Sequence, residues 1–196
     1  AEIRAAVRNN ILDGSIVPVE MGAGIECKGG YTLLDDIVKY LPSAESRKMN
    51  GINLKTNEIF EADFDFAKPK TAFIFKTIVD PYIGRYSLIK VRSGVLKTDD
   101  LVYNSRTTEE AKIGKIYTMM GNKATEVPEL HAGDLGALAK FGNAMTGDTL
   151  STKANPVQYA PMDISTPYTY IRYRAKNKDE IDKVQQALTK IMAEDP

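Results

Sequence analysis

The sequence predicts a mainly β protein, an antiparallel β-barrel flanked on each side by a partial α/β segment. Short strand-like stretches separated by turn residues recur at steady spacing between residues 69 and 153, which is typical of all-β barrels. Each flank combines helical patterns with a single strand-like stretch, which is too little to complete a domain. We therefore expect the chain to begin and end inside larger domains.

Residues 1–43 are predicted to be the C-terminal end of a larger α/β domain. Ile3, Val7 and Ile11 fall on one face of a first helix, and the apolar run at residues 15–20 is predicted to be a strand. A second helix is predicted from an apolar stripe that Pro42 ends. Its members are Leu33, Leu34, Ile37, Val38 and Leu41.

The middle of the chain divides into a linker and the barrel. Residues 44–68 are polar and rich in acidic side chains, and we interpret them as a linker and an entry strand. Residues 69–153 form the predicted barrel, because turn residues such as Ser93-Gly94 and Gly121-Asn122 separate its strand-like runs. The expected strands cover residues 72–79, 86–92, 101–104, 111–119 and 135–139.

Residues 154–196 are predicted to be the start of a further domain. A Tyr-rich strand is expected at 167–175, and a helix from about Lys178. Asn177 is expected to cap this helix, with Glu180 at the capping-box position. Its buried face is predicted to comprise Ile181, Val184, Leu188 and Ile191.

Composition excludes several classes of function. Lys plus Arg and Asp plus Glu both number 26, so no global field draws the chain to phosphates, and any nucleic-acid contact must be local. One cysteine, Cys27, and one histidine, His131, cannot make a Cys/His zinc cluster, and they favour a reduced, cytoplasmic compartment. No apolar run is long enough to span a bilayer. We expect no metal site and no membrane partner.

The motifs of nucleotide hydrolysis are missing from this sequence. It has no G-x-x-x-x-G-K-[ST] run to hold phosphates, so we expect no catalytic residue, no bound cofactor and no GTP hydrolysis by this chain. The run Asn177-Lys178-Asp179-Glu180 is superficially similar to the guanine-reading N-K-x-D motif. Its Asp stands one position early, however, and a helix cap explains the same residues.

Several runs in the barrel region carry a family resemblance. They are Asp-Pro-Tyr-Ile-Gly-Arg at 80–85, Val-Arg-Ser-Gly-Val-Leu at 91–96 and Val-Tyr-Asn at 102–104, followed by Ala-Gly-Asp at 132–134 and Thr-Gly-Asp at 146–148. Together they resemble the second domain of elongation factor G, a translational GTPase. The flanks resemble the end of that family's G domain and the first helix of its third domain. The resemblance is weakest at residues 44–67.

The resemblance implies a GTP-driven factor that binds the ribosome in the cytoplasm and promotes movement of tRNA and mRNA. The barrel, of the translation-factor domain II type, would dock on ribosomal RNA and proteins of the small subunit, while the parent's remaining domains would bind GTP or GDP with Mg. Docking suits basic side chains of a rigid barrel that contact the RNA backbone, although ordinary solubility also explains them. The candidates for contact with ribosomal RNA are Arg85, Arg92, Lys97, Arg106 and Lys112.

One piece of the nucleotide site is implied within this chain. The family's Gly-Ser-Ala loop, whose backbone N–H groups face guanine, aligns with residues 22–24, so the implied nucleotide-binding residues are Ala23, Gly24 and Ile25. The serine of the family is Ala23 here. Because the hydroxyl that braces the loop is lost, this difference favours a divergent paralogue over the housekeeping factor.

Two other functions compete with the elongation factor. A ribosomal-protection GTPase of the tetracycline-resistance type shares this domain order, but the barrel runs are closer to the elongation factor. A standalone β-barrel module that binds RNA or protein requires complete flanking domains, whereas the flanks here are incomplete.

Overall fold

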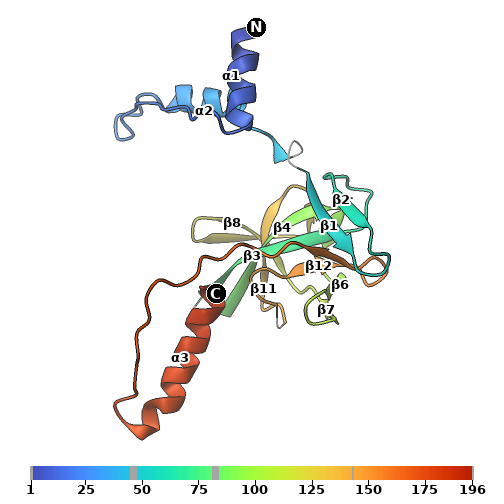
Figure 1. The fold of residues 1–196 in the computed structure, drawn as a ribbon, viewed down its shortest axis with the longest axis vertical. Coiled ribbons are helices and arrows are strands. Elements are labelled where there is room, and N and C mark those ends of the chain that lie inside the picture. The colour runs from blue at the N-terminus through green and yellow to red at the C-terminus, as the bar shows by residue number, and fades with distance from the viewer. Residues whose placement is uncertain (1, 45–47, 81–83, 143, 196) are drawn as a thin grey trace. The chain divides into compact units, whose positions relative to one another are not determined.

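A computed structural model describes residues 2–44, 48–80, 84–142 and 144–195 of the chain (Figure 1). It is mainly antiparallel β with few helices, as predicted. The chain divides into two compact units, Ala1–Arg47 and Lys48–Pro196, and each is described by itself. Residues 81–83, which belong to one of the family runs, lie outside the described residues, as does Pro196.

The first unit consists of helices α1 (Glu2–Leu12) and α2 (Gly30–Tyr40) and the loops around them. Gly14, at φ 82°, follows α1, and the Ile16 N–H donates to the Asn10 carbonyl at 2.9 Å, which turns the chain back along the helix. Both helices form as predicted, but neither contains a buried residue. Leu33 and Val38 of the predicted apolar stripe are 48% and 80% exposed, so this stripe has no covering layer within the unit.

The strand expected at residues 15–20 is not formed; these residues have no regular secondary structure. The prediction was wrong because an apolar run becomes a strand only when a neighbouring strand takes up its N–H and C=O groups. The described part of the first unit offers only the isolated bridge between Ala23 and Lys28.

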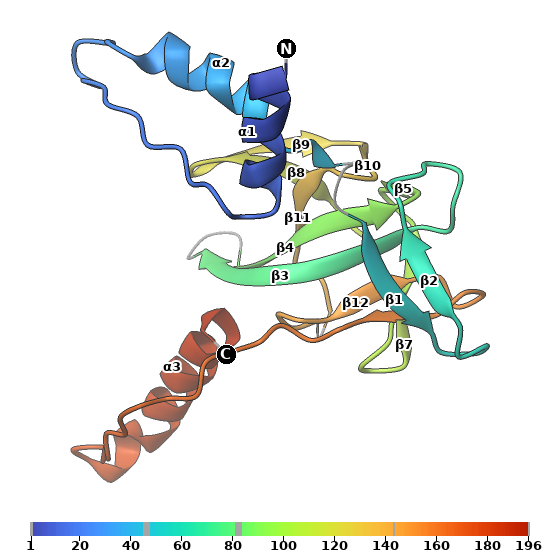
Figure 2. The same ribbon diagram turned by 45° about the horizontal axis from the view of Figure 1, so that its top comes forward.

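The second unit is built on an eight-stranded antiparallel sheet in the order β7-β6-β12-β3-β4-β11-β8-β9 (Figure 2). Its longest pair, β3 and β4, runs through the middle of the sheet. The run 111–119, expected as one strand, is divided into β7 and β8 around Gly114. The strands are β3 (Thr71–Asp80), β4 (Gly84–Ser93), β6 (Leu101–Asn104), β7 (Glu109–Lys112), β8 (Ile116–Met120), β9 (Lys123–Val127), β11 (Leu135–Ala139) and β12 (Thr149–Ser151).

A closed barrel was expected, and the strand pairing does not show one. Among the described residues, the eight strands form an open row that ends at β7 and β9, and β5 (Val95–Lys97) pairs separately with β10 (Glu129–His131). The sheets nevertheless enclose one apolar core, to which both sheets contribute. Packing around a common core therefore curves these sheets without a continuous ring of backbone hydrogen bonds. Its fully buried large side chains include Ile74, Ile89, Leu96, Val102, Ile116, Leu130, Leu138 and Leu150.

A third sheet occupies the region that was interpreted as a linker and an entry strand. β1 (Met49–Asn53) lies between β2 (Ile59–Ala62) and β13 (Val157–Tyr159) in antiparallel pairing. A second apolar cluster, in which Ala62, Phe73, Val157 and Tyr159 are buried, joins this sheet to β3. We call the three sheets of the second unit, with the loops between their strands, the β unit. Residues 48–62 are therefore an integral part of it.

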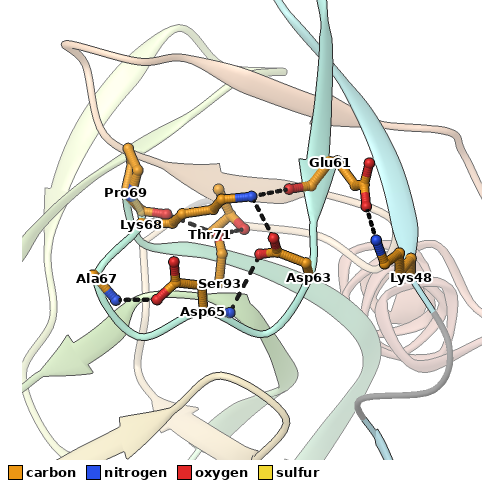
Figure 3. Close-up of polar contacts among 9 residues, drawn as sticks. All are labelled: Lys48, Glu61, Asp63, Asp65, Ala67, Lys68, Pro69, Thr71 and Ser93. Carbon is orange, nitrogen blue, oxygen red and sulfur yellow. Dashed lines mark hydrogen bonds and ion pairs between the residues drawn. The ribbon is translucent and has the colours of Figure 1, made fainter.

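The loop that leads from β2 into β3 is held by polar side chains (Figure 3). Lys68 Nζ donates to the Glu61 carbonyl at 3.2 Å and pairs with Asp63 Oδ2 at 2.6 Å. At the start of β3, the Ser93 hydroxyl donates to the Pro69 carbonyl at 2.7 Å and lies 2.7 Å from the Thr71 hydroxyl. These bonds fix the path of the chain between the two sheets.

Tyr159 connects the start of β3 to β13, and it makes the stability of the second unit depend on pH in the alkaline range. Its hydroxyl lies 2.7 Å from the Thr71 hydroxyl, and the residue is 2% exposed. Burial raises the pKa of Tyr159 from 10.0 to about 12, against smaller opposing effects of the Thr71 bond and the Arg92 charge. The folded state therefore holds this proton more tightly than the unfolded state does. The resulting stabilisation is complete below pH 10 and is lost as the pH rises to about 12.

We expect the Tyr159→Phe variant to be less sensitive to alkali than the original chain. Between pH 8 and pH 11, the original should lose about 1.4 kcal/mol more unfolding free energy than the variant, roughly one pKa unit. At pH 8 the variant should be the less stable protein, because it lacks the bond to Thr71. Urea unfolding at the two pH values measures both effects. Equal losses in the two proteins would contradict this assignment.

The C-terminal part of the second unit differs from its prediction. No strand forms at residues 167–175; residues 160–177 have neither helix nor strand. A single turn of 3-10 helix, η2 (Lys178–Glu180), leads into α3 (Ile181–Glu194), and Asn177 precedes η2 without a side-chain capping bond. The capping box is therefore absent. The predicted buried face is covered only in part: Val184 and Leu188 are half-buried, whereas Ile181 and Ile191 are 50% and 57% exposed.

Candidate functional site

A turn between β5 and β6 gathers three lysines around two aspartates. Lys70 Nζ lies 2.5 Å from Asp100 Oδ2, and Lys112 Nζ lies 2.9 Å from Asp99 Oδ1. The backbone N–H of Lys97 donates to Asp100 Oδ2 at 2.8 Å, and its Nζ pairs with Glu129 at 3.1 Å. We call this set the turn cluster, comprising Lys70, Lys97, Lys112, Asp99, Asp100 and Glu129.

The turn cluster balances three positive charges with three carboxylates. The Lys97 and Lys112 side chains are 61% and 62% exposed, so their ion pairs lie in water and contribute little to stability. An incoming phosphate can take the place of such a carboxylate partner. Two of the five predicted contact residues are thus brought together, and Lys70 is a neighbour that the sequence prediction missed. Which of these lysines lies beside which carboxylate depends on the geometry of the turn, so the sequence alone could not predict it.

Two of the predicted arginines are committed to bonds within the protein. The Arg85 guanidinium donates to the Phe141 carbonyl at 3.4 Å and to the Gly142 carbonyl. Arg106 forms a two-pronged pair with Asp148, with Nε to Oδ1 at 2.6 Å and Nη2 to Oδ2 at 3.0 Å. The bond to Asp148 raises the pKa of Arg106 above its usual range. Both arginines shape loops, and engaging a phosphate would mean giving up these bonds.

The other basic side chains lie elsewhere on the β unit. Arg92 is half-buried on β4, and its charge acts on Tyr159. Lys76 on β3 and Lys123 on β9 are exposed, and no carboxylate in the described chain lies within ion-pair distance of either. The sequence prediction did not single out these two lysines, because the strand register decides whether a carboxylate lies near a given lysine.

The loop predicted to face guanine is folded on itself. The N–H of Ala23 donates to the Lys28 carbonyl at 3.1 Å, and the Ala23 carbonyl accepts the N–H groups of Glu26 and Lys28. Gly29, at φ 81°, follows the loop and makes the turn into α2. One of the three predicted backbone donors is therefore already bonded within the loop. Ile25 is fully exposed at the tip.

A hollow of about 410 Å³ lies between this loop and α2. Gly22, Gly24 and Gly29 line it together with the acidic side chains Glu20 and Asp36. Desolvation and the neighbouring Asp36 carboxylate raise the pKa of Glu20. These two carboxylates oppose an anion in the hollow. Lys28 also lines the hollow, so the charges around it are mixed, and the loop keeps a shape with room beside it.

Across residues 2–44, 48–80, 84–142 and 144–195, no three side chains of the His, Cys, Asp and Glu types are grouped so as to hold a metal ion. Within the same ranges, no helix has the length and apolar character required to cross a membrane.

Comparisons with known proteins identify the β unit. The family model described as elongation factor G domain 2 matches residues 69–153. Elongation factor G of Karelsulcia muelleri (strain GWSS) is 34% identical over 196 residues, which cover 100% of this chain and 28% of that relative. The chain thus spans less than a third of the length of this curated relative.

A solved structure agrees in fold. A crystal structure of a protein from Thermus thermophilus superposes with a TM-score of 0.73 at 24% identity, covering 98% of this chain and 27% of the other. At this identity the likeness concerns the fold alone. The matched domain and the curated relative establish the relationship: the chain is related to a segment of elongation factor G and contains the elongation factor G domain 2.

Proposed function

We propose that this chain is the ribosome-docking segment of an elongation factor G-like GTPase that acts in the cytoplasm on tRNA and mRNA movement. The observation that carries the proposal is the domain 2 match over residues 69–153. GTP or GDP, with Mg, would be bound by other parts of the parent protein. The segment itself supplies a docking surface and no hydrolysis, since the sequence lacks a phosphate-binding loop.

The turn cluster supplies the electrostatic part of this docking. The backbone positions of its lysines are set before binding, because the strands that carry or adjoin them pack on the apolar core of the β unit. Exposed pairs such as Lys112 with Asp99 exchange a carboxylate for an RNA phosphate at small cost. Because the cluster is charge-balanced, we expect the binding to be weak and strongly dependent on salt.

The proposal is tested by co-sedimentation of the chain with small ribosomal subunits over a series of salt concentrations. The double variant Lys97→Glu with Lys112→Glu should bind more weakly, and its logarithmic salt slope should fall by about two, one for each phosphate contact. Asp99→Asn should bind more tightly, because it frees Lys112, and asparagine accepts the φ of 65° at this position.

Lys48→Glu is the matched control for these variants. Lys48 is also an exposed lysine with a carboxylate partner, Glu61, but it lies beside the three-stranded sheet. Its binding should equal that of the original chain. If the double variant and this control bind alike, the turn cluster is not the docking surface. Sedimentation that does not change with salt would count against electrostatic docking altogether.

A further inference from the structure

The side chain of Glu129 lies between two basic groups at the edge of the turn cluster. Its Oε2 pairs with Lys97 Nζ at 3.1 Å, and its Oε1 lies 3.3 Å from His131 Nε2. The strand pairing brings these groups together, because Glu129 stands opposite Lys97 across β5 and β10, and His131 follows on the same face of β10. One carboxylate is therefore shared by a permanent cation and a group that is charged only when protonated.

Two carboxylates and one aromatic ring surround the His131 imidazole. Its Nδ1 lies 3.7 Å from Asp134 Oδ2, and the same carboxylate accepts the His131 backbone N–H at 2.8 Å. The Phe66 ring packs against the imidazole at a centroid distance of 5.3 Å. In the part of the chain that the structure describes, the charged groups within ion-pair distance of this imidazole are Glu129 and Asp134.

The loop from β2 into β3, which carries Phe66, has its own charges engaged within the loop. Lys68 Nζ pairs with Asp63 at 2.6 Å, and the Asp65 carboxylate accepts the Ala67 N–H at 2.8 Å. On β5, the charged neighbour is Lys97, which lies on the far side of the Glu129 carboxylate. Among the described residues, a proton on His131 thus meets two carboxylates at close range.

The protonation state of His131 determines what Lys97 leaves behind when it binds a phosphate. With a neutral imidazole, the departure of Lys97 leaves the Glu129 charge uncompensated, and that charge repels the RNA backbone. With a protonated imidazole, His131 takes over the ion pair with Glu129, and the turn cluster gains one positive charge. The His131 side chain is 43% exposed, so water can deliver the proton without opening the fold.

We propose that His131 makes the docking of the turn cluster on RNA phosphates depend on pH. The protonated histidine holds Glu129, frees Lys97 for a phosphate and tightens binding. This gain is present at low pH and is lost as the pH rises and the imidazole gives up its proton. The inference rests on the proposed ribosome docking and specifies how the same surface is regulated.

The inference is tested by co-sedimentation of the whole chain with small ribosomal subunits at about pH 6 and about pH 8, at one low salt concentration. The original chain should bind about fivefold more tightly at the lower pH, the effect of one additional exposed ion pair. His131→Gln should lose this difference, because glutamine is neutral at both values. His131→Lys should bind tightly at both, because lysine keeps its charge. His131 is the only histidine in the sequence, so no other imidazole of the chain contributes.

Glu129→Gln tests whether this carboxylate is the shared group. The variant removes the negative charge that Lys97 leaves behind, so at the higher pH it should bind as tightly as the original chain does at the lower pH. Glu126→Gln is the matched control, because Glu126 is also an exposed carboxylate paired with a lysine, Lys115, outside the turn cluster. Its binding should equal that of the original chain at each pH.

The outcomes separate this inference from ribosome docking itself. If the original chain binds equally well at both pH values, or if His131→Gln keeps the full pH response, the inference is wrong while salt-dependent docking stands. The same holds if Glu129→Gln binds no more tightly than the Glu126→Gln control at the higher pH. If the original chain does not sediment with the subunits at either pH, both proposals are wrong.

Discussion

Replacing Gly94 by alanine is expected to destabilise the β unit by about 3 kcal/mol, through backbone strain and overpacking together. Gly94 has φ 69°, and a Cβ built there would stand 2.6 Å from the Lys68 carbonyl oxygen and 2.7 Å from the Lys70 Cα. Both neighbours are backbone atoms of the loop that leads from β2 into β3. Neither can move without breaking the bonds that hold the loop, such as the Gly94 N–H to the Asp65 carbonyl at 2.8 Å.

Gly121→Ala is the matched control for this substitution. Gly121 also has a positive φ, 59°, but nothing lies within 4 Å of a Cβ built there. The unfolding free energy of this variant should therefore fall by only about 1 kcal/mol, the strain of an alanine with left-handed backbone angles. Urea unfolding of the three proteins measures the difference. Equal losses of unfolding free energy at the two glycines would show that the short contacts of an added Cβ at Gly94 do not lower stability.

Replacing Asp148 by alanine is the second change expected to have a large effect, a loss of about 3 kcal/mol in unfolding free energy. The Asp148 side chain is 3% exposed and accepts bonds from Arg106, from Asn104 Nδ2 at 2.7 Å and from the Met145 N–H at 2.9 Å. Without the carboxylate, a buried amide and a backbone N–H lose their partner. The loop between β6 and β7 also loses its tie to β12.

Glu126→Ala provides the comparison for Asp148→Ala. Glu126 forms an ion pair of similar length with Lys115, 2.7 Å, but its side chain is 50% exposed. Its removal should cost less than about 1 kcal/mol, because water screens exposed pairs. Thermal unfolding of both variants distinguishes the cases. If both variants have the same melting temperature, burial does not govern the contribution of the Asp148 network to stability.

The sequence predicted those elements whose signals are local. The apolar stripe of α2 and the turn residues around β3, β4, β6 and β11 place these elements correctly. The region of β1 and β2 was expected to hold one entry strand, and β13 was missed, because the pairing of β1 with β13 joins Gly51 to Tyr159, far apart in sequence. The same distance hid the pair of Arg106 with Asp148. Long-range pairing leaves no pattern in a single sequence.

The two strands predicted in error show that a strand-like composition alone is not enough to form a strand. Residues 15–20 and 167–175 have the composition of strands, yet the described chain supplies no neighbour for either. For the candidate site, residue type alone could not tell Arg106, which is committed to Asp148, from Lys112, which is exposed in a labile pair. Whether the predicted contact residues and the loop at Ala23 bind their implied partners stays a prediction.

The most direct test of ribosome docking is competition for small ribosomal subunits between this chain and an intact elongation factor G. A labelled chain is bound at low salt, and the unlabelled factor is then added with a nonhydrolysable GTP analogue. We predict that the factor displaces the chain completely, because on our proposal both dock on the same surface through domain 2. Binding of the chain that the intact factor does not reduce, or no binding at low salt, would contradict this account.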